Sequence, residues 1–513
     1  MARGKGKRRF REAARPSAQS IYLDALSRND SVGNRGDRLV WVELMKTRTQ
    51  QTSQEETHQT VPLKVSTASG PQSIQIGFTE QRILGHAGLA LMSGYLQRIG
   101  WREQLAAALP HAPRSPNAFA PVDVALGFMA GVWCGADKFS RVGHLAADPL
   151  LPEVLGTEAL PSQPTLTRFF GGFNQHSNTA GFGRLSRWLC GRLPSQRGGY
   201  TLDLDSTAIV HEDGHQEGVR VGYTPRGLKP AHHPLLAALA EAKLVCGFWL
   251  RSGHAATLNN APAFLDHTPA HLPAQVRVGL VRGDAGFCSA EFLAHLRRRG
   301  LDYIVVTPLH TRLRQHCRHE DAAWTPTGVP GLEAQEVTGA ELDAPGRRVI
   351  LLRQRVAERP EAGGKCLLEV PGYRFQALIT SLPRSWSPVA VWRRYNGRAE
   401  IENRIKELAH QFGLKSFCCR KFWATEAACQ LAILAYNLCV LFQRHLGQTQ
   451  KVELQTLRFR LFSRAAIFSH AQGRPTLKFA IPPPHRAWWR SLLEKLQSPL
   501  PPWNCNSVGS LAA

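Results

Sequence analysis

The spacing of apolar and polar residues changes character along the chain. Between residues 73 and 195 apolar residues recur every three or four positions, as in the run from Leu89 to Leu96, and this spacing predicts helices. From Tyr200 onward the apolar residues come in short runs separated by polar, Gly-rich turns, which predicts strands. We therefore expect a mainly helical segment followed by an α/β segment. The segment boundaries that we expect are 1–72, 73–195, 196–307, 308–385, 386–480 and 481–513.

The middle of the chain predicts a mixed sheet, because a group of early strands and a helix are followed by alternating strands and helices. We expect strands at residues 200–210, 219–223, 235–239, 243–250, 275–284 and 303–306, and helices at 261–265 and 290–299. Residues 308–385 interrupt the alternation. Their apolar runs predict three further strands, at 348–356, 366–370 and 373–381, and we interpret this segment as a β-rich insertion.

A helix with one unusually polar face is expected after the insertion. Ser387 can cap a helix whose first residue is Pro388. Proline is favourable there because an amide hydrogen at the first helical position has no partner within the helix. Spacings of three, four and four place a phenol, a guanidinium, a carboxylate and an ammonium on one face of that helix. These residues are Tyr395, Arg398, Glu402 and Lys406. A solvated surface helix can show the same pattern, so the face alone does not establish a functional site.

The two ends of the chain lack a hydrophobic period. Residues 1–72 begin with basic residues and continue with Gln, Thr and Ser, so we expect a disordered extension, within which Met45 offers an alternative start. Residues 481–513 form a tail rich in Pro and Trp. The longest apolar run, Ala427–Phe442, is short for a membrane span and is interpreted as a buried core helix. No secretory signal is visible at the N-terminus.

The charge balance indicates a polyanionic partner. Lys and Arg number 63 against 39 acidic residues, which gives a formal net charge of +24. Such an excess is typical of proteins that bind nucleic acid. Ribosomal, chromatin and secreted basic proteins share it, so the charge does not identify the partner by itself.

The cysteines and histidines do not suggest a disulfide framework or a zinc site. Eleven cysteines include no C-x-x-C pair, and the adjacent pair Cys418–Cys419 argues for a reducing compartment. We therefore expect a cytoplasmic protein without a membrane partner. The spacing within the cluster His310, His316, Cys317 and His319 matches no common zinc arrangement.

Three acidic residues are candidates for one catalytic site. Asp205 lies in the first predicted strand, Asp284 ends a later strand, and Glu402 lies on the polar helix. Three carboxylates brought together by a mixed sheet can hold two divalent cations that act on a phosphodiester. An aspartate at a strand end is common without any function. Asp203 competes with Asp205, because two residues along a strand it faces the same side; we prefer Asp205 because Ser206 and Thr207 follow it.

The motifs in combination resemble those of the DDE transposases of bacterial insertion sequences. The segments that carry the resemblance lie between about residues 75 and 480. They are Asp205-Ser-Thr, His215-Gln-Glu-Gly218, Gly222-Tyr223, Arg282-Gly-Asp284-Ala-Gly-Phe287 and Tyr395-x-x-Arg398-x-x-x-Glu402-Asn-Arg-Ile-Lys-Glu-Leu. The most similar group is the group 1 DDE domain, the insertion-sequence family numbered thirteen-eighty, with a Tyr-Arg-Glu-Lys signature.

The resemblance implies a fold and a set of site residues. The fold is an RNase H-like, mixed-sheet α/β catalytic core with a β-rich insertion, preceded by a mainly helical N-terminal domain that binds the element ends. Asp205, Asp284 and Glu402 are implied to be catalytic metal ligands for two Mg²⁺ ions, which Mn²⁺ can replace. Tyr395 and Arg398 are implied to contact the DNA phosphate. The signature lysine falls at position 409, where this chain has Ala409, and Lys406 one turn earlier is expected to substitute for it.

The resemblance also implies an activity and partners. We expect an enzyme that cleaves DNA at the terminal inverted repeats of its element and joins the 3′-hydroxyls to target DNA. We expect it to act as a homodimer in a synaptic complex and to associate with the bacterial nucleoid. A nuclease or resolvase with the same core is one alternative. An inactive DNA-binding relic is the other, with Ala409 as its support.

Overall fold

The computed structural model describes residues 61–67, 70–111, 118–211, 214–318, 323–338, 347–356, 372–448 and 450–499. The chain divides into two compact units, residues 1–81 and 82–513. The strand predicted at 366–370 lies outside the described residues.

The described part of the first unit is a β-hairpin. Strands β1 (Val61–Thr67) and β2 (Gly70–Ile76) pair in antiparallel register, with Val61 opposite Ile76. The expectation of disorder up to residue 72 is therefore wrong for this segment. The missed signal is the alternation of Val61, Leu63 and Val65 with polar residues, which is the period of a strand.

Helices dominate the beginning of the second unit. The first residues of these helices follow local rules: Pro121 occupies the first turn of α5, Ser162 caps α8, and Asn174 forms a capping box with Ser177 at α9. Their bounds are α3 (Leu89–Arg98), α4 (Trp101–Ala108), α5 (Pro121–Cys134), α6 (Phe139–His144), α7 (Leu151–Leu155), α8 (Gln163–Gly171) and α9 (Gln175–Cys190).

A nine-stranded mixed sheet follows, in the order β12-β13-β14-β15-β11-β10-β4-β8-β9. Five of these strands form an RNase H-like core. Strands β4, β8 and β9 are antiparallel neighbours, and β10 and β11 continue the sheet in parallel to β4. The core elements are β4 (Tyr200–Ser206), β8 (Leu235–Leu239), β9 (Leu244–Trp249), α10 (Ala261–Ala270), β10 (Val278–Gly283), α11 (Ala290–Arg298) and β11 (Asp302–Thr307). The predicted mixed α/β fold is thus confirmed.

The strands of residues 308–385 extend this same sheet. Strand β15 pairs antiparallel with the core strand β11, with Ile304 opposite Thr380, and β14 and β13 continue outward from it. Apolar side chains on one face of this extension pack against the helix that follows, α13 (Pro388–Asn396), in a second small core. The bounds of the elements in this segment are α12 (Thr311–Cys317), β12 (Thr325–Pro326), β13 (Leu332–Thr338), β14 (Arg348–Arg355) and β15 (Tyr373–Thr380).

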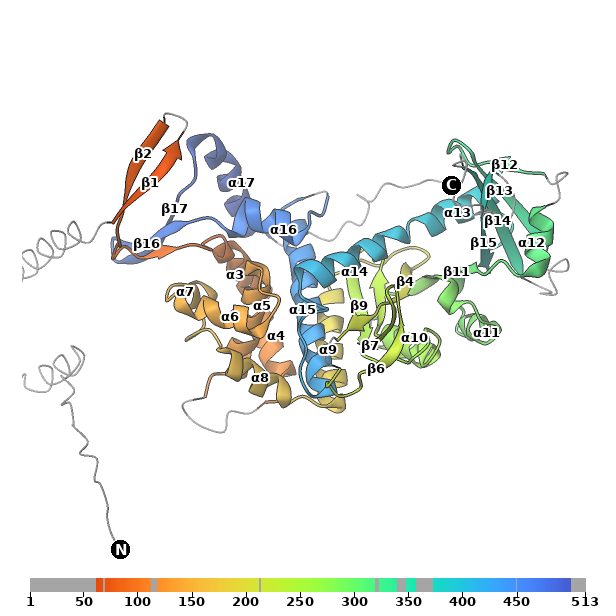
Figure 1. Cartoon of the computed structure of the whole chain (residues 1–513), viewed down its shortest axis with the longest axis horizontal. Coiled ribbons are helices and arrows are strands. Elements are labelled where there is room, and N and C mark those ends of the chain that lie inside the picture. Colours follow the sequence, from red (N-terminus) through yellow and green to blue (C-terminus); the bar gives the residue numbers. More distant parts are fainter. Residues whose placement is uncertain are drawn as a thin grey trace, which may run out of the picture. The chain divides into compact units, whose positions relative to one another are not determined.

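The helix predicted to begin at Ser387 and Pro388 is interrupted. Ser387 caps α13 as expected, but α13 ends at Asn396 and α14 (Ala399–Gln411) begins three residues later. Across the break the amide of Arg398 bonds the carbonyl of Tyr395, three residues earlier. The single continuous helix that the spacing predicts is therefore wrong, although Arg398 still contacts Glu402 across this region, at 3.2 Å. The two helices follow one another in Figure 1.

Helix α15 (Phe422–His445) is the central helix of the second unit, as Figure 1 shows. It contacts α5, α8 and α9 of the helical segment and also the sheet strand β9. In the described part of the chain it is the one helix long and apolar enough to cross a membrane, and 94% of its most apolar window is buried inside the protein. It contains the run interpreted as a core helix.

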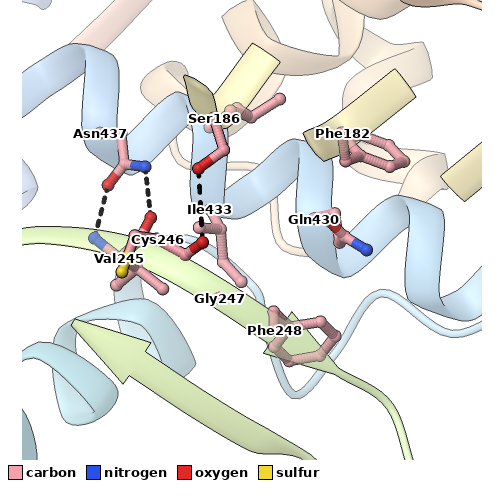
Figure 2. A pocket seen from close by; sticks show the side chains of 10 residues that line it. Phe182, Ser186, Val245, Cys246, Gly247, Phe248, Gln430, Ile433 and Asn437 are labelled. Carbon is pink, nitrogen blue, oxygen red and sulfur yellow. Dashed lines mark hydrogen bonds between the residues drawn. The ribbon is translucent and has the colours of Figure 1, made fainter. Parts of the chain in front are cut away.

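Side chains of α15 occupy the place of a further strand beside β9, the edge of the sheet. Asn437 accepts a hydrogen bond from the Val245 amide (3.0 Å) and donates one to its carbonyl (2.8 Å). Figure 2 shows both bonds, with Ser186 of α9 donating to the carbonyl of Cys246. The remaining cavity between α9, β9 and α15 has a volume of about 30 Å³. The amide and carbonyl of Val245 and the carbonyl of Cys246 on this edge strand are therefore paired inside the protein.

Glu426 of α15 is a buried carboxyl that makes folding pH-dependent. It accepts hydrogen bonds from the Leu250 amide and from Asn178 and Gln430, yet burial raises the pKa of Glu426 from 4.5 to about 7. The folded state thus binds this proton more tightly than the unfolded state. The folding free energy therefore becomes less favourable as the pH rises from about 4.5 to about 7.

We expect Glu426→Gln to gain stability relative to the parent protein as the pH rises from 5 to 8, by up to about 3 kcal/mol, because glutamine has no charge to bury. The gain should shrink as the pH falls toward 5. Urea unfolding at both pH values measures the difference. Glu494→Gln, at an exposed position of a C-terminal helix, is the control and should change neither value. A stability gain that does not depend on pH would contradict the assignment.

Two three-stranded sheets complete the second unit. One contains β5 (Ile209–Val210), β6 (Arg220–Thr224) and β7 (Gly227–His232), so the strand predicted at 200–210 is two strands in different sheets. The other contains β3 (Ile83–Leu84), β16 (Ala466–Ala471) and β17 (Arg474–Phe479). The segment described as a Pro/Trp-rich tail contains α17 (Arg486–Gln497), which contacts α3, and Trp489 of this helix packs on Phe479 of β17.

Candidate active site

Asp205 is placed by the central strand β4. Six of the seven residues of this strand are buried, and the Asp205 side chain is 12% exposed. One of its carboxylate oxygens accepts a hydrogen bond from the amide of Ser206 (2.8 Å). The carboxylate therefore lies at the inner end of the site, with its orientation fixed by the backbone of the next residue.

Asp284 is placed directly after the neighbouring strand β10. Its Oδ1 accepts a hydrogen bond from the amide of Gly286 (2.9 Å), which caps a short 3-10 turn, Ala285–Phe287. Because β4 and β10 are adjacent and parallel, their carboxyl ends meet at the same edge of the sheet. The side chain of Asp284 is 42% exposed. The sheet thus brings the two aspartates to one place.

Arg398, in the break between α13 and α14, gathers the three predicted carboxylates around one guanidinium. Its Nη2 lies 3.2 Å from Oδ1 of Asp205 and 4.0 Å from Oδ2 of Asp284, and its Nη1 lies 3.2 Å from Oε1 of Glu402. Nη2 also donates to the carbonyl of Leu204 (3.1 Å). The structure therefore brings together residues separated by almost 200 positions in the sequence.

The site is buried at one end and open at the other. Arg398 is 4% exposed and Glu402, on the first turn of α14, has a side chain that is 67% exposed. Burial is the largest cause that raises the pKa of Asp205, to about 6, and the neighbouring charges of Asp284 and Glu402 raise it further while Arg398 opposes them. The carboxylates repel one another, so a cation bound among them would be stabilised.

Asp203, the competitor of Asp205, is already paired with another residue. Its two carboxylate oxygens accept hydrogen bonds from Nε and Nη2 of Arg282, at 2.6 and 2.8 Å, and both side chains are almost completely buried. Arg282 also donates to the carbonyl of Arg394 near the end of α13. This bidentate pair connects β4, β10 and α13, and it leaves Asp205 as the aspartate of β4 that faces the other two acids.

The other predicted site residues lie at different depths. Tyr395 interacts with Arg398 and packs against the second core, and burial raises the pKa of its phenol. Lys406 is exposed, and no ion pair joins it to the three carboxylates in the part of the chain that is described. Ala409 is 8% exposed, so position 409 faces the interior. The DNA-phosphate contacts expected for Tyr395, Arg398 and Lys406 stay predictions.

The supporting arginines were not predicted from the sequence. Arg394 donates to Thr201 Oγ1 (2.5 Å) and Glu241 Oε1 (2.9 Å), and Arg282 binds Asp203, so both fix α13 on the sheet. A signal for Arg282 was present, because it is a charged residue inside the apolar run that leads to Asp284. A charge in a buried strand requires a buried partner. The sequence did not identify which acid that partner is.

The donor set fits a hard divalent cation, since all three acids supply carboxylate oxygens. Among the described residues, no three Asp, Glu, His or Cys side chains stand close enough to share one metal ion. The guanidinium of Arg398 lies between the carboxylates instead. The oxygen donors of the site therefore suit a divalent metal ion. In this structure the positive group beside the acids is the guanidinium of Arg398.

Comparisons with known proteins give the family of the chain. No curated protein matches the chain. Among solved structures, the chain is similar to the piggyBac transposase in its cryo-EM synaptic complex with hairpin DNA, at 11% sequence identity and a TM-score of 0.38 over 74% of this chain and 80% of that one. Residues 66–500 match the family described as transposase DDE domain, group 1. The chain belongs to this family of transposases.

Proposed function

We propose that this protein is a transposase that cleaves DNA at the ends of its element and joins the 3′-hydroxyls to target DNA. The observation that carries the proposal is the convergence of Asp205, Asp284 and Glu402 on Arg398 at one edge of the RNase H-like sheet. The narrower assignment to insertion-sequence family thirteen-eighty, with its Tyr-Arg-Glu-Lys signature, stays part of the proposal.

The three carboxylates would hold the divalent cations, two Mg²⁺ ions with Mn²⁺ as a substitute. Such a pair activates the attacking hydroxyl or water and stabilises the leaving oxygen of a phosphodiester. The protein supports this by holding Asp205 in a buried strand and Glu402 at the open side, where DNA can approach. Burial raises the pKa of Asp205 to about 6, and a bound cation would favour the ionised form of this carboxylate.

Arg398 has a positioning role in this proposal. In the structure its guanidinium lies beside all three acids and donates a hydrogen bond to the carbonyl of Leu204. Cations that bind the acids would release part of the guanidinium's hydrogen-bonding capacity toward a DNA phosphate, the contact that the family resemblance implies. Tyr395 is held beside it by the second core. The net charge of +24 supports the DNA partners, and the homodimer in a synaptic complex is proposed with them.

A cleavage assay with the DNA that flanks the gene tests the proposed function. Linear DNA that carries both flanks should be nicked at the element ends in Mg²⁺ or Mn²⁺ and should stay intact in EDTA. Binding to the same DNA should persist in EDTA, which separates recognition from chemistry. Cleavage that persists in EDTA would refute the metal-dependent mechanism, and cleavage without joining would indicate the nuclease alternative.

The positions of Lys406 and Ala409 lead to opposite expectations for the two residues. Lys406 is exposed on α14 one turn after Glu402, so Lys406→Ala should slow cleavage by the loss of one charge-assisted hydrogen bond, about 1.5–3 kcal/mol in activation free energy. Ala409 faces the interior, so Ala409→Lys should lower stability and should not raise activity. Cleavage rates and thermal unfolding of both variants measure these effects. A faster Ala409→Lys enzyme of normal stability would show that the signature position is functional in this chain.

A further inference from the structure

The hairpin of β6 and β7 presents its apolar side chains to solvent. Tyr223 lies directly opposite Leu228 in the antiparallel register, and Val221 is two residues before Tyr223 on the same face. These three side chains are 80%, 70% and 60% exposed, respectively. Exposed apolar residues that share one face mark an interaction surface more often than isolated ones do.

The opposite face of the hairpin packs closely against the backbone of the protein. A side chain at Gly222 would collide with the carbonyl of Gly253, and one at Gly253 would collide with the backbone of Ala231. His232 at the end of β7 is completely buried, with Nε2 2.9 Å from the carbonyl oxygen of Glu217. The inner face is thus fixed on the protein, and the apolar outer face cannot be buried by a rotation of the strands.

Exposed cations accompany the apolar face. Arg226 lies in the turn between the strands, while Lys229 lies opposite Gly222 and Arg220 opposite Ala231, so these two side chains leave the hairpin on its other face; all three residues are exposed. From residue 219 to residue 240 the sequence contains no Asp or Glu. The hairpin therefore combines an aromatic ring and aliphatic side chains on one face with positive charge at its turn and on its other face, and no acid within this segment balances that charge.

The chain connects this surface closely to Asp205. Leu236 of β8 lies opposite Asp205, and Lys229 is seven residues before Leu236. Seven residues span at most about 25 Å, so Lys229 lies within the length of about seven base pairs of any DNA bound at the carboxylates.

We propose that the β6–β7 hairpin is a DNA-contact element beside the active site, with Val221, Tyr223 and Leu228 on its outer face, Arg226 at its turn and Lys229 on its other face. Arg226 and Lys229 contact phosphates, and the ring of Tyr223 stacks on a nucleobase. Other proteins bind nucleic acid with the same combination of basic and aromatic side chains. The proposal rests on the proposed function. A second copy of the chain fits this surface less well, because two such hairpins would bring like charges together.

The cations are tested by the salt dependence of DNA binding in EDTA, where no cleavage is expected. Fluorescence anisotropy of the labelled flank DNA gives the slope of log affinity against log salt. Arg226→Gln/Lys229→Gln should reduce the magnitude of the slope by about 1.8, since each lost phosphate contact contributes about 0.9. Arg474→Gln/Lys478→Gln, on the exposed β17 strand, removes the same charge and should change the slope less.

The aromatic contact is tested by Tyr223→Ala in the same assay. Loss of one stacked base should weaken binding about 5- to 150-fold and leave the salt slope unchanged. Tyr223→Phe should bind like the parent protein, because stacking needs the ring and not the hydroxyl. Phe459→Ala removes another aromatic ring that is 67% exposed and should have no effect.

Hairpin variants that bind like their controls would overturn the proposal. A shift from dimer to monomer in Tyr223→Ala, measured by sedimentation without a loss of DNA affinity, would also overturn it in favour of a self-association surface. A different result would contradict the proposed function. If the parent protein binds DNA through the hairpin but does not cleave it in Mg²⁺, the DNA-contact proposal stands and the transposase proposal is wrong.

Discussion

Asp205→Asn, Asp284→Asn and Glu402→Gln should each reduce strand cleavage by about 10³-fold or more while DNA binding stays close to that of the parent protein. Each substitution removes one negative donor from the set that would hold the cations, and loss of several kcal/mol of transition-state stabilisation corresponds to this factor. Single-turnover cleavage of the labelled flank DNA measures the rate. The amount of Mn²⁺ bound by each folded variant, measured by electron paramagnetic resonance, should fall in parallel.

Glu400→Gln is a matched control, because it removes a half-exposed acid two residues before Glu402 on the same helix. It should cleave at close to the normal rate. One result would contradict the assignment of Asp205 as the first acid. If a folded Asp203→Asn variant loses cleavage and Asp205→Asn keeps it, the ligand on β4 is Asp203.

The second large effect concerns folding. Asp203→Leu should lower the free energy of unfolding by about 3–5 kcal/mol, because it leaves the buried guanidinium of Arg282 without its bidentate partner. The double variant Asp203→Leu/Arg282→Met should recover most of this loss, since it removes both buried charges together. Urea unfolding of the two single variants and the double variant gives the coupling energy.

Asp266→Leu provides the comparison at the surface. Asp266 also receives a two-point contact from an arginine, Arg299, but the two side chains are 31% and 54% exposed. Solvent screens such a pair, so the loss should stay below about 1 kcal/mol. Equal losses at Asp203 and Asp266 would show that burial does not set the strength of the Arg282 pair.

Much of the fold could be predicted because local signals and tertiary structure agree. The cap at Ser289 gives the helix α11 to within one residue, and the apolar run before Asp284 gives the end of β10, which begins three residues later than predicted. The break before α14 was missed although a turn-forming pair, Asn396 and Gly397, ends α13 there. The β-hairpin at residues 61–76 was missed because the polar residues around it dominated the composition.

The candidate site could be predicted in part. The three acids are recognisable by their positions after strands and on a polar helix, and by their resemblance to a family. Their convergence on Arg398 is visible only in the folded structure. The same is true of the choice between Asp203 and Asp205. Two aspartates with the same strand period cannot be distinguished without knowing that Arg282 lies across from one of them. The burial of Ala409 likewise follows from packing and not from helical spacing.

The bonding of Asn437 to Val245 restricts how copies of this protein can assemble. A strand of another molecule cannot pair with Val245 of β9, since Asn437 of α15 already holds its outward amide and carbonyl. At the opposite edge, β12 has only two residues, Pro326 lacks an amide hydrogen, and β12 covers only Glu333 and Ala334 of β13. Strand addition is therefore hindered at the β9 edge. An assembly of the second unit at that edge must use side-chain surfaces, which can form and separate without exchange of strands.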